Sequence, residues 1–363
     1  MITVEIYETN TTFQLVDKWE ELIGKDYLYM CKLINLVQQN EISILELRTL
    51  FVAYILNIGN FRKHNMLKKS TSNKIYSNLE YLGKAIRFPL KLDWNFPDNN
   101  PLSAELIEKL NKYEPSEIME EHLQEEIEKY SNLIFIDADG DRTPNAKYTV
   151  DLNFAFNPLP IVNINNTFYH GPKFSTKKIN GSYDIHTDIT ATQFIEAYTY
   201  YYQYAITADI DNIKSLFNSL YNEVTERSSQ YKVVESDEET VLMGVYYWFS
   251  AMMQFFSNKT IYSLIWTGQS SDKFSLGMVS EVFSLSKKGY GSVSEIENTD
   301  LLKYFDMIIH NIIEYLNEMK FMVISKRKDY NQTQLRTYKL TDSEYHEIEN
   351  LTGYDSETLK SFI

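Results

Sequence analysis

Apolar side chains recur at helical spacing over most of the chain. Tyr27, Met30, Cys31 and Ile34 fall three or four residues apart, which predicts an amphipathic helix. A polar break at 40–43 ends this helix, and a second apolar stripe predicts another, formed by Leu45, Leu47, Leu50, Phe51, Tyr54, Ile55 and Ile58. Comparable patterns predict further helices at about 74–87, 102–131, 237–257, 274–286 and 299–326.

Polar residues that favour helix N-termini precede several later stripes. Either Asp188 or Thr190 is placed to cap a helix, and Asp209 and Asp211 are placed to cap the next one. Near the end of the chain, the pair Thr341-Asp342 predicts one more short helix.

Short alternating or apolar segments predict β-strands at the start and in the middle of the chain. Residues 1–12 alternate as a strand does, and residues 13–22 are expected to lead into the first helix. Further strands are expected at 88–94 and 133–136, and a hairpin at 161–164 and 167–169, closed by His170-Gly171-Pro172.

These elements predict a mainly α fold, with two helical subdomains joined by a small segment of strands and loops. The predicted parts are an N-terminal helical domain at 1–131, a β-rich linker at 132–175, a C-terminal helical domain at 176–326 and a charged tail at 327–363. Both helical parts contain a cap, an amphipathic helix, a polar break and a second helix. A distant duplication is therefore one interpretation, and chance similarity of two helical hairpins is the other.

The charge balance narrows the class of partner. The chain has 363 residues and a formal net charge of −15, which argues against a protein built to bind nucleic acid or an anionic membrane. Acidic residues crowd at 105–128, whereas residues 62–69 form a small basic island. The most apolar stretch, 241–256, is shorter than the roughly 20 residues of a membrane span, so a buried helix is expected there. No signal-peptide pattern is recognised, so an intracellular location is expected.

Aromatic residues are the unusual feature of the composition. They make up 14% of the chain, with 28 tyrosines, and they concentrate at 194–204 and 246–256. Tyrosine has an apolar ring and a polar hydroxyl, so such clusters pack in a core or contact a partner at a surface. Both interpretations stay open, and the candidate partner-binding residues are Tyr198, Tyr201, Tyr202, Tyr246, Tyr247 and Trp248.

Recognisable chemical motifs are scarce. Asp137, Asp139 and Asp141 have the spacing that begins a calcium loop, but the later positions of that loop carry unsuitable residues. The six histidines show no helical zinc spacing, and Cys31 lies within an apolar stripe, as a buried residue would. We therefore predict no catalytic residue, no cofactor and no metal site, and we interpret the aspartates as turn residues.

Two stretches of the chain nevertheless have a familiar order of residues. The first is Trp19-Glu20-Glu21-Leu22 with Tyr27 and the helix around Leu47-Arg48-Thr49-Leu50-Phe51. The second is Asn157-Pro158-Leu159-Pro160, Phe168-Tyr169-His170-Gly171-Pro172, Ile189-Thr190, Gln193-Phe194-Ile195-Glu196-Ala197 and 216–221. This order resembles a family of uncharacterised proteins from phages and prophages of Bacteroidetes-type bacteria. The chain departs from the family pattern at Gln193 and Asn222.

The resemblance implies a role in binding rather than catalysis. Members of that family lie among tail genes, which implies a tail assembly factor, chaperone-like, or a minor structural tail protein. The implied partner is a tail or tape-measure protein, and the implied location is the cytoplasm of the bacterial host or the virion. Two alternatives stay open: an enzyme with a dispersed site that uses a metal at Asp137 and Asp139, and an adaptor that acts on host proteins.

Overall fold

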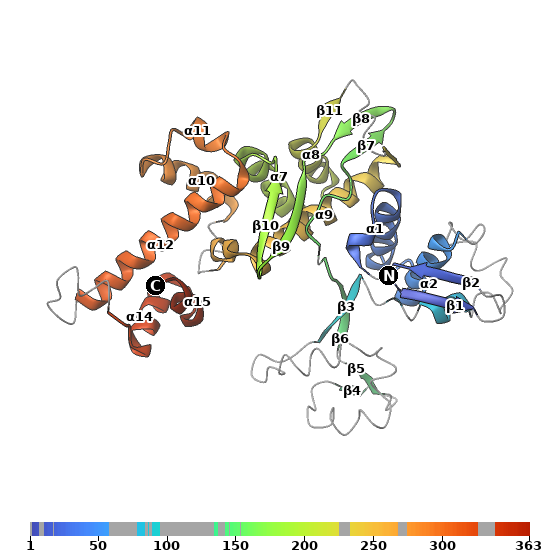
Figure 1. Ribbon diagram of the computed structural model, residues 1–363, viewed down its shortest axis with the longest axis horizontal. Helices are drawn as coiled ribbons and strands as arrows, with labels where there is room; N and C mark the ends of the chain where they lie inside the picture. Colours follow the sequence, from blue (N-terminus) through green and yellow to red (C-terminus); the bar gives the residue numbers. More distant parts are fainter. Residues whose placement is uncertain are drawn as a thin grey trace. The chain divides into compact units, whose positions relative to one another are not determined.

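The chain divides into two compact units. The computed structural model describes residues 2–6, 11–16, 18–57, 78–83, 86, 89–94, 134–136, 142–144, 146–152, 154–224, 233–267, 274–325 and 338–363. Unit 1 contains Met1–Glu21 and Leu33–Leu152, and unit 2 contains Leu22–Lys32 and Asn153–Ile363. The division falls within helix α1 (Lys25–Gln38). The described part is mainly helical with small β-sheets, as the sequence predicts (Figure 1).

Unit 1 combines helices with small antiparallel strand pairs. Its helical elements are η1 (Trp19–Glu21), the second part of α1, and α2 (Ile44–Ile55). Its strand pairs are β1 (Ile2–Ile6) with β2 (Thr11–Leu15), β3 (Leu90–Trp94) with β6 (Ala146–Val150), and β4 (Ile134–Ile136) with β5 (Arg142–Pro144). The strand expected over residues 1–12 is instead a pair of strands, and the second of them continues past residue 12, because Phe13 lies within β2, opposite Val4.

Unit 2 is built around α9 (Glu238–Lys259), the helix predicted at 237–257. Fourteen of its 22 residues are buried, and they lie on all sides of the helix. A helix that is apolar all round is stable in water only when other elements cover it. The prediction of a buried helix at 241–256 is therefore confirmed, and no helix in the described ranges is long and apolar enough to cross a membrane.

Two helices that begin at predicted caps cover one part of α9. Thr190 and Gln193 form a capping box at the start of α7 (Ala191–Thr207), and the side chain of Asp209 caps α8 (Ile210–Leu220). The ring of Phe194 on α7 packs against Phe249 on α9, with ring centroids 5.9 Å apart. These capping positions are confirmed, because the side-chain oxygens accept from the free amides of the first helical turn.

A four-stranded sheet lies elsewhere in unit 2. Its order is β11 (Asn222–Val224), β8 (Thr167–His170), β7 (Ile161–Ile164) and β12 (Val234–Glu235), and β12 runs parallel to β7. The predicted hairpin at 161–169 is the central pair of this sheet. In addition, the first part of α1 belongs to unit 2, where Tyr27 donates its hydroxyl to the carbonyl oxygen of Gly244 on α9 at 2.7 Å.

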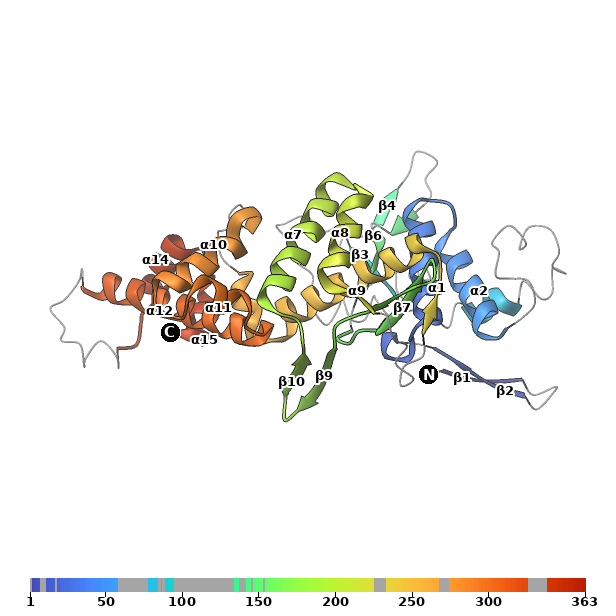
Figure 2. The same ribbon diagram turned by 90° about the horizontal axis from the view of Figure 1, so that it is seen from above.

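A second hairpin follows, and all but its first two residues lie in the segment that the sequence interpretation assigned to the C-terminal helical domain. Strands β9 (Phe174–Ile179) and β10 (Ser182–Thr187) pair antiparallel, and their tip extends beyond the helices of unit 2 (Figure 2). The turn is Asn180-Gly181, and both residues have positive φ, 50° and 88°. A two-residue turn with positive φ matches the twist of the two strands that it joins, and glycine adopts a positive φ without steric cost.

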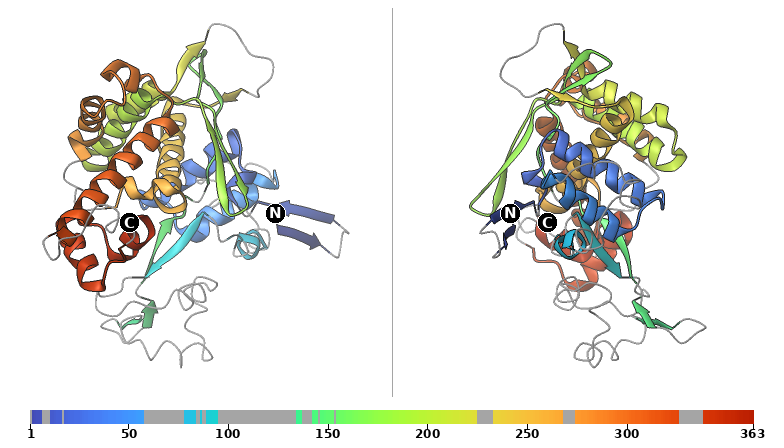
Figure 3. Two further views of the ribbon diagram at one scale, coloured as in Figure 1. Left: turned by 60° about the vertical axis from the view of Figure 1, so that its left-hand side comes forward. Right: turned by 90° about the vertical axis from the view of Figure 1, so that its right-hand side faces the viewer.

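The C-terminal helices of unit 2 pack on a long helix, α12 (Leu301–Ser325). Before it come η3 (Ile261–Ile265), α10 (Phe274–Lys287) and α11 (Val293–Glu297). After it come α14 (Asp342–Thr352) and α15 (Ser356–Phe362), drawn in red in Figure 3. Leu316 and Val323 of α12 form a buried cluster with Ile348 and Leu359. The predicted cap at Thr341 is confirmed, whereas the proposed duplication of the two halves stays a prediction.

Three buried tyrosines donate hydrogen bonds to main-chain carbonyl groups in unit 2. Besides Tyr27, Tyr221 donates to Leu159 at 3.0 Å and Tyr304 donates to Met278 at 2.9 Å. Burial raises the pKa of all three phenols well above the ordinary value. Because a buried phenolate loses its hydration, the folded protein strongly favours the neutral, hydrogen-bonded form.

We expect the free energy of unfolding to fall at alkaline pH because of these tyrosines. Below about pH 10 the phenols are neutral in the folded and the unfolded chain, and their hydrogen bonds contribute fully to the free energy of unfolding. Above that value the unfolded chain ionises while the folded chain keeps its protons, so stability is lost as the pH rises.

The substitution Tyr304→Phe tests this expectation through urea unfolding at pH 8 and pH 11. At pH 8 the variant should be less stable by about 1 kcal/mol, because the carbonyl of Met278 loses its donor. At pH 11 the difference should shrink or change sign, since phenylalanine does not titrate. A cost that is the same at both values would contradict the expectation.

Candidate functional site

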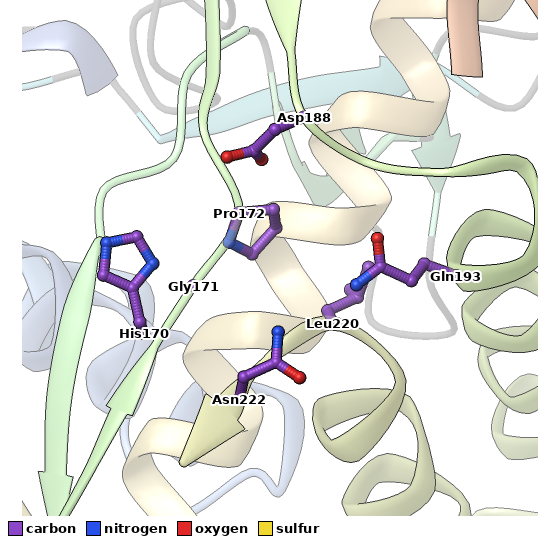
Figure 4. A pocket seen from close by; sticks show the side chains of 7 residues that line it. All are labelled: His170, Gly171, Pro172, Asp188, Gln193, Leu220 and Asn222. Atoms are coloured by element: carbon purple, nitrogen blue, oxygen red, sulfur yellow. The ribbon is translucent and has the colours of Figure 1, made fainter. Parts of the chain in front are cut away.

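A small pocket lies in unit 2 where β8 ends and α7 begins. Its volume is about 150 Å³, and its lining residues are His170, Gly171, Pro172, Asp188, Gln193, Leu220 and Asn222. These residues come from four places in the sequence: the end of β8, the segment after β10, the first turn of α7, and the junction of α8 with β11. Figure 4 shows their side chains around one space, with polar groups of Asp188, Gln193 and Asn222 around Pro172.

The floor of the pocket depends on the close approach of Tyr221 to Gly171. A Cβ atom at position 171 would lie 2.5 Å from Cε1 of Tyr221, so only glycine fits. The Tyr221 ring is stacked on Phe217, with centroids 4.6 Å apart, and its hydroxyl donates a hydrogen bond to the carbonyl oxygen of Leu159. The amide of Asn157 completes this network, because it donates to Pro172 at 2.8 Å and accepts from Leu159 at 2.8 Å.

The start of α7 forms another side of the pocket, and three main-chain amides there have partners within the protein. The Gln193 Oε1 atom accepts from the Thr190 amide at 3.0 Å, and the Gln193 amide donates to the Thr190 hydroxyl at 3.3 Å. The next amide, that of Ala191, donates to Thr299 at 2.9 Å. These amides therefore bond within the protein rather than toward the pocket.

Asp188 supplies the carboxylate of the pocket. Its Oδ1 atom accepts from the main-chain amide of Lys173 at 2.7 Å, which ties the end of β10 to the segment before β9. The side chain itself is exposed. The pocket thus combines one carboxylate, one imidazole and two side-chain amides with the apolar surfaces of Pro172 and Leu220.

The tyrosines predicted to bind a partner fall into two groups. Tyr198, Tyr201 and Tyr246 are half-buried, and Tyr202 is 39% exposed. Tyr247 and Trp248 are 3% and 0% exposed, so both side chains belong to the core of unit 2. A partner at this surface would contact the first group.

The half-buried tyrosines pack on one another where α7 lies along α9. Tyr201 stacks on Tyr246 with centroids 5.3 Å apart, and Tyr204 meets the same ring edge-on at 5.0 Å. The hydroxyl groups of Tyr201 and Ser250 share a hydrogen bond of 3.1 Å. Partial burial raises the pKa of Tyr246 to about 12, so this ring is neutral at physiological pH.

An exposed apolar patch lies beside these rings at the junction of α7 and α8. It consists of Tyr202, Ile206 and Ile210, and Ile206 is 67% exposed. Tyr202 and Ile206 are four residues apart and therefore neighbours on one helix face. Ala208, with φ of 55°, ends α7 between the two isoleucines. We call these three residues the α7–α8 patch.

Other sequence candidates lie outside the pocket and the patch. Asp137, Asp139 and Asp141, the basic island at 62–69 and the acidic stretch at 105–128 all lie outside the described residues. Cys31 is buried, as expected, and burial raises the pKa of its thiol, which disfavours the reactive thiolate. In the ranges that the structure describes, no three side chains of His, Cys, Asp or Glu are grouped to hold a metal ion.

Sequence reasoning did not predict the pocket, although it named several of its parts. His170-Gly171-Pro172, Gln193 and Leu220 occur in the motifs that carry the family resemblance, and Asp188 was one of two candidate caps. The structure brings these residues together. The signal that could have linked them is the Asn180-Gly181 turn, because a hairpin there returns the chain from Pro172 to Asp188.

Comparison with known proteins gives no assignment. No protein-family model matches the chain, and neither a curated protein nor a solved structure is significantly similar to it. The fold and the site define the protein only as a mainly helical one, with a small polar pocket and an exposed aromatic patch on its second unit.

The substitution Gly171→Ala should destabilise unit 2. The added methyl group would clash with a tyrosine ring that is stacked on one side and hydrogen-bonded at its hydroxyl. We expect a loss of about 1–3 kcal/mol in the free energy of unfolding, measured by urea denaturation. Ser182→Ala, at an exposed position of β10, is the control and should change little. Equal stability of the two variants would show that the ring moves aside.

A second pair of substitutions separates the two groups of aromatic residues. Trp248→Ala should lower the free energy of unfolding by about 3–5 kcal/mol, because a fully buried indole leaves a cavity. Tyr202→Ser should change it by less than about 1 kcal/mol, because this ring is substantially exposed. Thermal and urea unfolding of both variants would measure the difference, and similar losses would place Tyr202 in the core as well.

Proposed function

We propose that this chain is a non-enzymatic binding protein of a phage or prophage, which acts in tail assembly or as a minor tail protein. The observation that carries the binding role is the α7–α8 patch, with Tyr202, Ile206 and Ile210 exposed beside half-buried tyrosines. Isolated exposed apolar residues are ordinary on protein surfaces, whereas contiguous ones that include an aromatic ring are typical of contact sites.

The local packing makes this patch suitable for recognition. Tyr201 and Tyr204 of α7 are held by packing on Tyr246, so these two rings lose little conformational entropy when a partner that covers the patch also contacts them. A tyrosine at such a boundary offers apolar ring surface and a hydroxyl for hydrogen bonding. These properties favour tyrosine in the energetic centre of protein interfaces.

The proposed partner is a tail component with apolar helical surface, such as a tape-measure segment before assembly. The resemblance of the motifs to a family found among tail genes supports this choice. The net charge of −15 supports a protein partner over nucleic acid, because phosphate groups would be repelled. The protein would act in the cytoplasm of the bacterial host, and as a minor tail protein it would remain in the virion.

Affinity capture from induced, prophage-carrying cells tests this function. The tagged full-length chain should retain a tail or tape-measure protein, identified by mass spectrometry. The double substitution Tyr202→Ser/Ile206→Ser removes exposed contact residues and should weaken the isolated complex by about tenfold or more.

Ile261→Ser is the matched control for that experiment. Ile261 is 63% exposed, close to the 67% of Ile206, but it lies on η3, outside the patch. Full retention by Ile261→Ser, together with loss in the double variant, supports the proposal. Capture without any tail component would overturn the tail function, and equal binding by all variants would overturn the patch as its site.

A further inference from the structure

The pocket at the start of α7 is too small for a cofactor and has the size of a single side chain. Ligand pockets for drug-sized molecules or cofactors usually enclose about 300–1,000 Å³. This pocket has about 150 Å³, and two of its lining residues, Asp188 and Asn222, are exposed. A group that enters from another molecule would therefore be a short one, such as the end of one long side chain.

The carboxylate of the pocket favours a ligand that donates hydrogen bonds and carries positive charge. Asp188 uses Oδ1 to hold the Lys173 amide, and among the described residues no donor is bonded to its Oδ2. Asn222 adds a side-chain amide, which Figure 4 shows with its nitrogen toward Pro172 and its oxygen turned away. A carboxylate that keeps one oxygen available binds a cationic donor more strongly than a neutral one.

An anionic ligand is disfavoured at the same place, although the pocket lies at a helix N-terminus. Anions bind such termini through free main-chain amides, and here the amides of Thr190, Ala191 and Gln193 already donate within the protein. The carboxylate of Asp188 would also repel an anion. These three amides are therefore not free to hold an anion.

The remaining walls suit the apolar part of a long basic side chain. Pro172 and the buried Leu220 present hydrocarbon surface, and the imidazole of His170 adds a flat ring. Arginine buries its methylene stem on apolar surface while its planar guanidinium group pairs with a carboxylate and stacks on flat groups. Lysine supplies the charge but neither the planar fork nor the stacking.

We propose that this pocket binds an arginine side chain of a partner protein, with its guanidinium group on Asp188 and its stem against Pro172 and Leu220. The net charge of −15 favours a partner with a basic contact surface. The inference rests on the proposed binding function for the statement that the arginine belongs to a protein. It adds a second contact, distinct in its residues from the α7–α8 patch.

The test uses the purified full-length chain and a small probe, N-acetyl-L-arginine amide. Histidine labelled with carbon-13 at Cε1 gives one NMR signal for each of the six histidines, and His170→Gln identifies the signal of the pocket. Titration with the probe should move the His170 signal saturably. N-acetyl-L-citrulline amide has nearly the same shape but no charge. It should bind at least about tenfold more weakly than the arginine probe.

Two substitutions locate the interaction. Asp188→Asn keeps an oxygen for the Lys173 amide but removes the charge, and it should weaken the arginine probe roughly 10- to 100-fold. Asp184→Asn removes the same charge from an exposed position of β10 that does not line the pocket, and it should leave binding unchanged. Equal binding of the arginine and citrulline probes, equal binding to both variants, or an unmoved His170 signal would each overturn the inference.

This experiment fails or succeeds independently of the proposed function. It measures the pocket with a purified protein and a defined probe, whereas the capture experiment measures a complex that depends on Tyr202 and Ile206. A captured tail protein with no arginine binding would overturn the pocket inference alone. The probe comparison on the wild-type chain also remains decisive if Asp188→Asn does not fold.

Discussion

The burial of α9 is the constraint on which the structure of unit 2 depends. A 22-residue helix that is apolar on nearly every side needs partners in every direction. Segments far apart in the sequence supply them, and aromatic rings make many of the contacts. The contacts include Tyr27 from α1 with Gly244, Tyr221 from the end of α8 with Trp248, Phe194 from α7 with Phe249, Phe174 from β9 with Phe256, and Phe305 from α12 with Phe256. The excess of aromatic residues is thus explained first by this core.

The position of the pocket follows from the same constraint. Helices and strands that cover an apolar helix direct their regular side chains inward, so polar groups collect where those elements begin and end. Asp188, Gln193 and Asn222 stand at such ends, after β10, in the first turn of α7 and at the start of β11. The Tyr221–Gly171 contact holds these ends together, because the ring fills the space that a larger residue at 171 would need. A polar pocket therefore forms directly above an aromatic core.

Local signals in the sequence predicted most helices, whereas features that depend on contacts between distant residues were not predicted. Thr190, Asp209 and Thr341 cap helices through neighbours within three residues, so their effect can be read from the sequence. The β9–β10 hairpin escaped because most of its side chains are exposed and its alternation of apolar residues is weak. The sequence could not show that Tyr246 is half-buried and Tyr247 fully buried, because a helix covered on all sides has no apolar stripe that distinguishes buried from exposed positions. The pocket required contacts between residues up to about 50 positions apart, which periodicity does not encode.

The two candidate contacts on α7 face in different directions. At about 100° per residue, the nine positions from Gln193 to Tyr202 correspond to about 180° around the helix. The pocket and the α7–α8 patch thus lie on opposite sides of one rigid, capped element, so occupation of one leaves the other open. Tyr200 is seven residues from Gln193, two turns along the same side, and lies about 10 Å further along the axis. A partner that occupies the pocket must therefore reach around the helix to contact Tyr202 as well. Two weak contacts on one rigid helix bind a single partner strongly only if that partner wraps around α7.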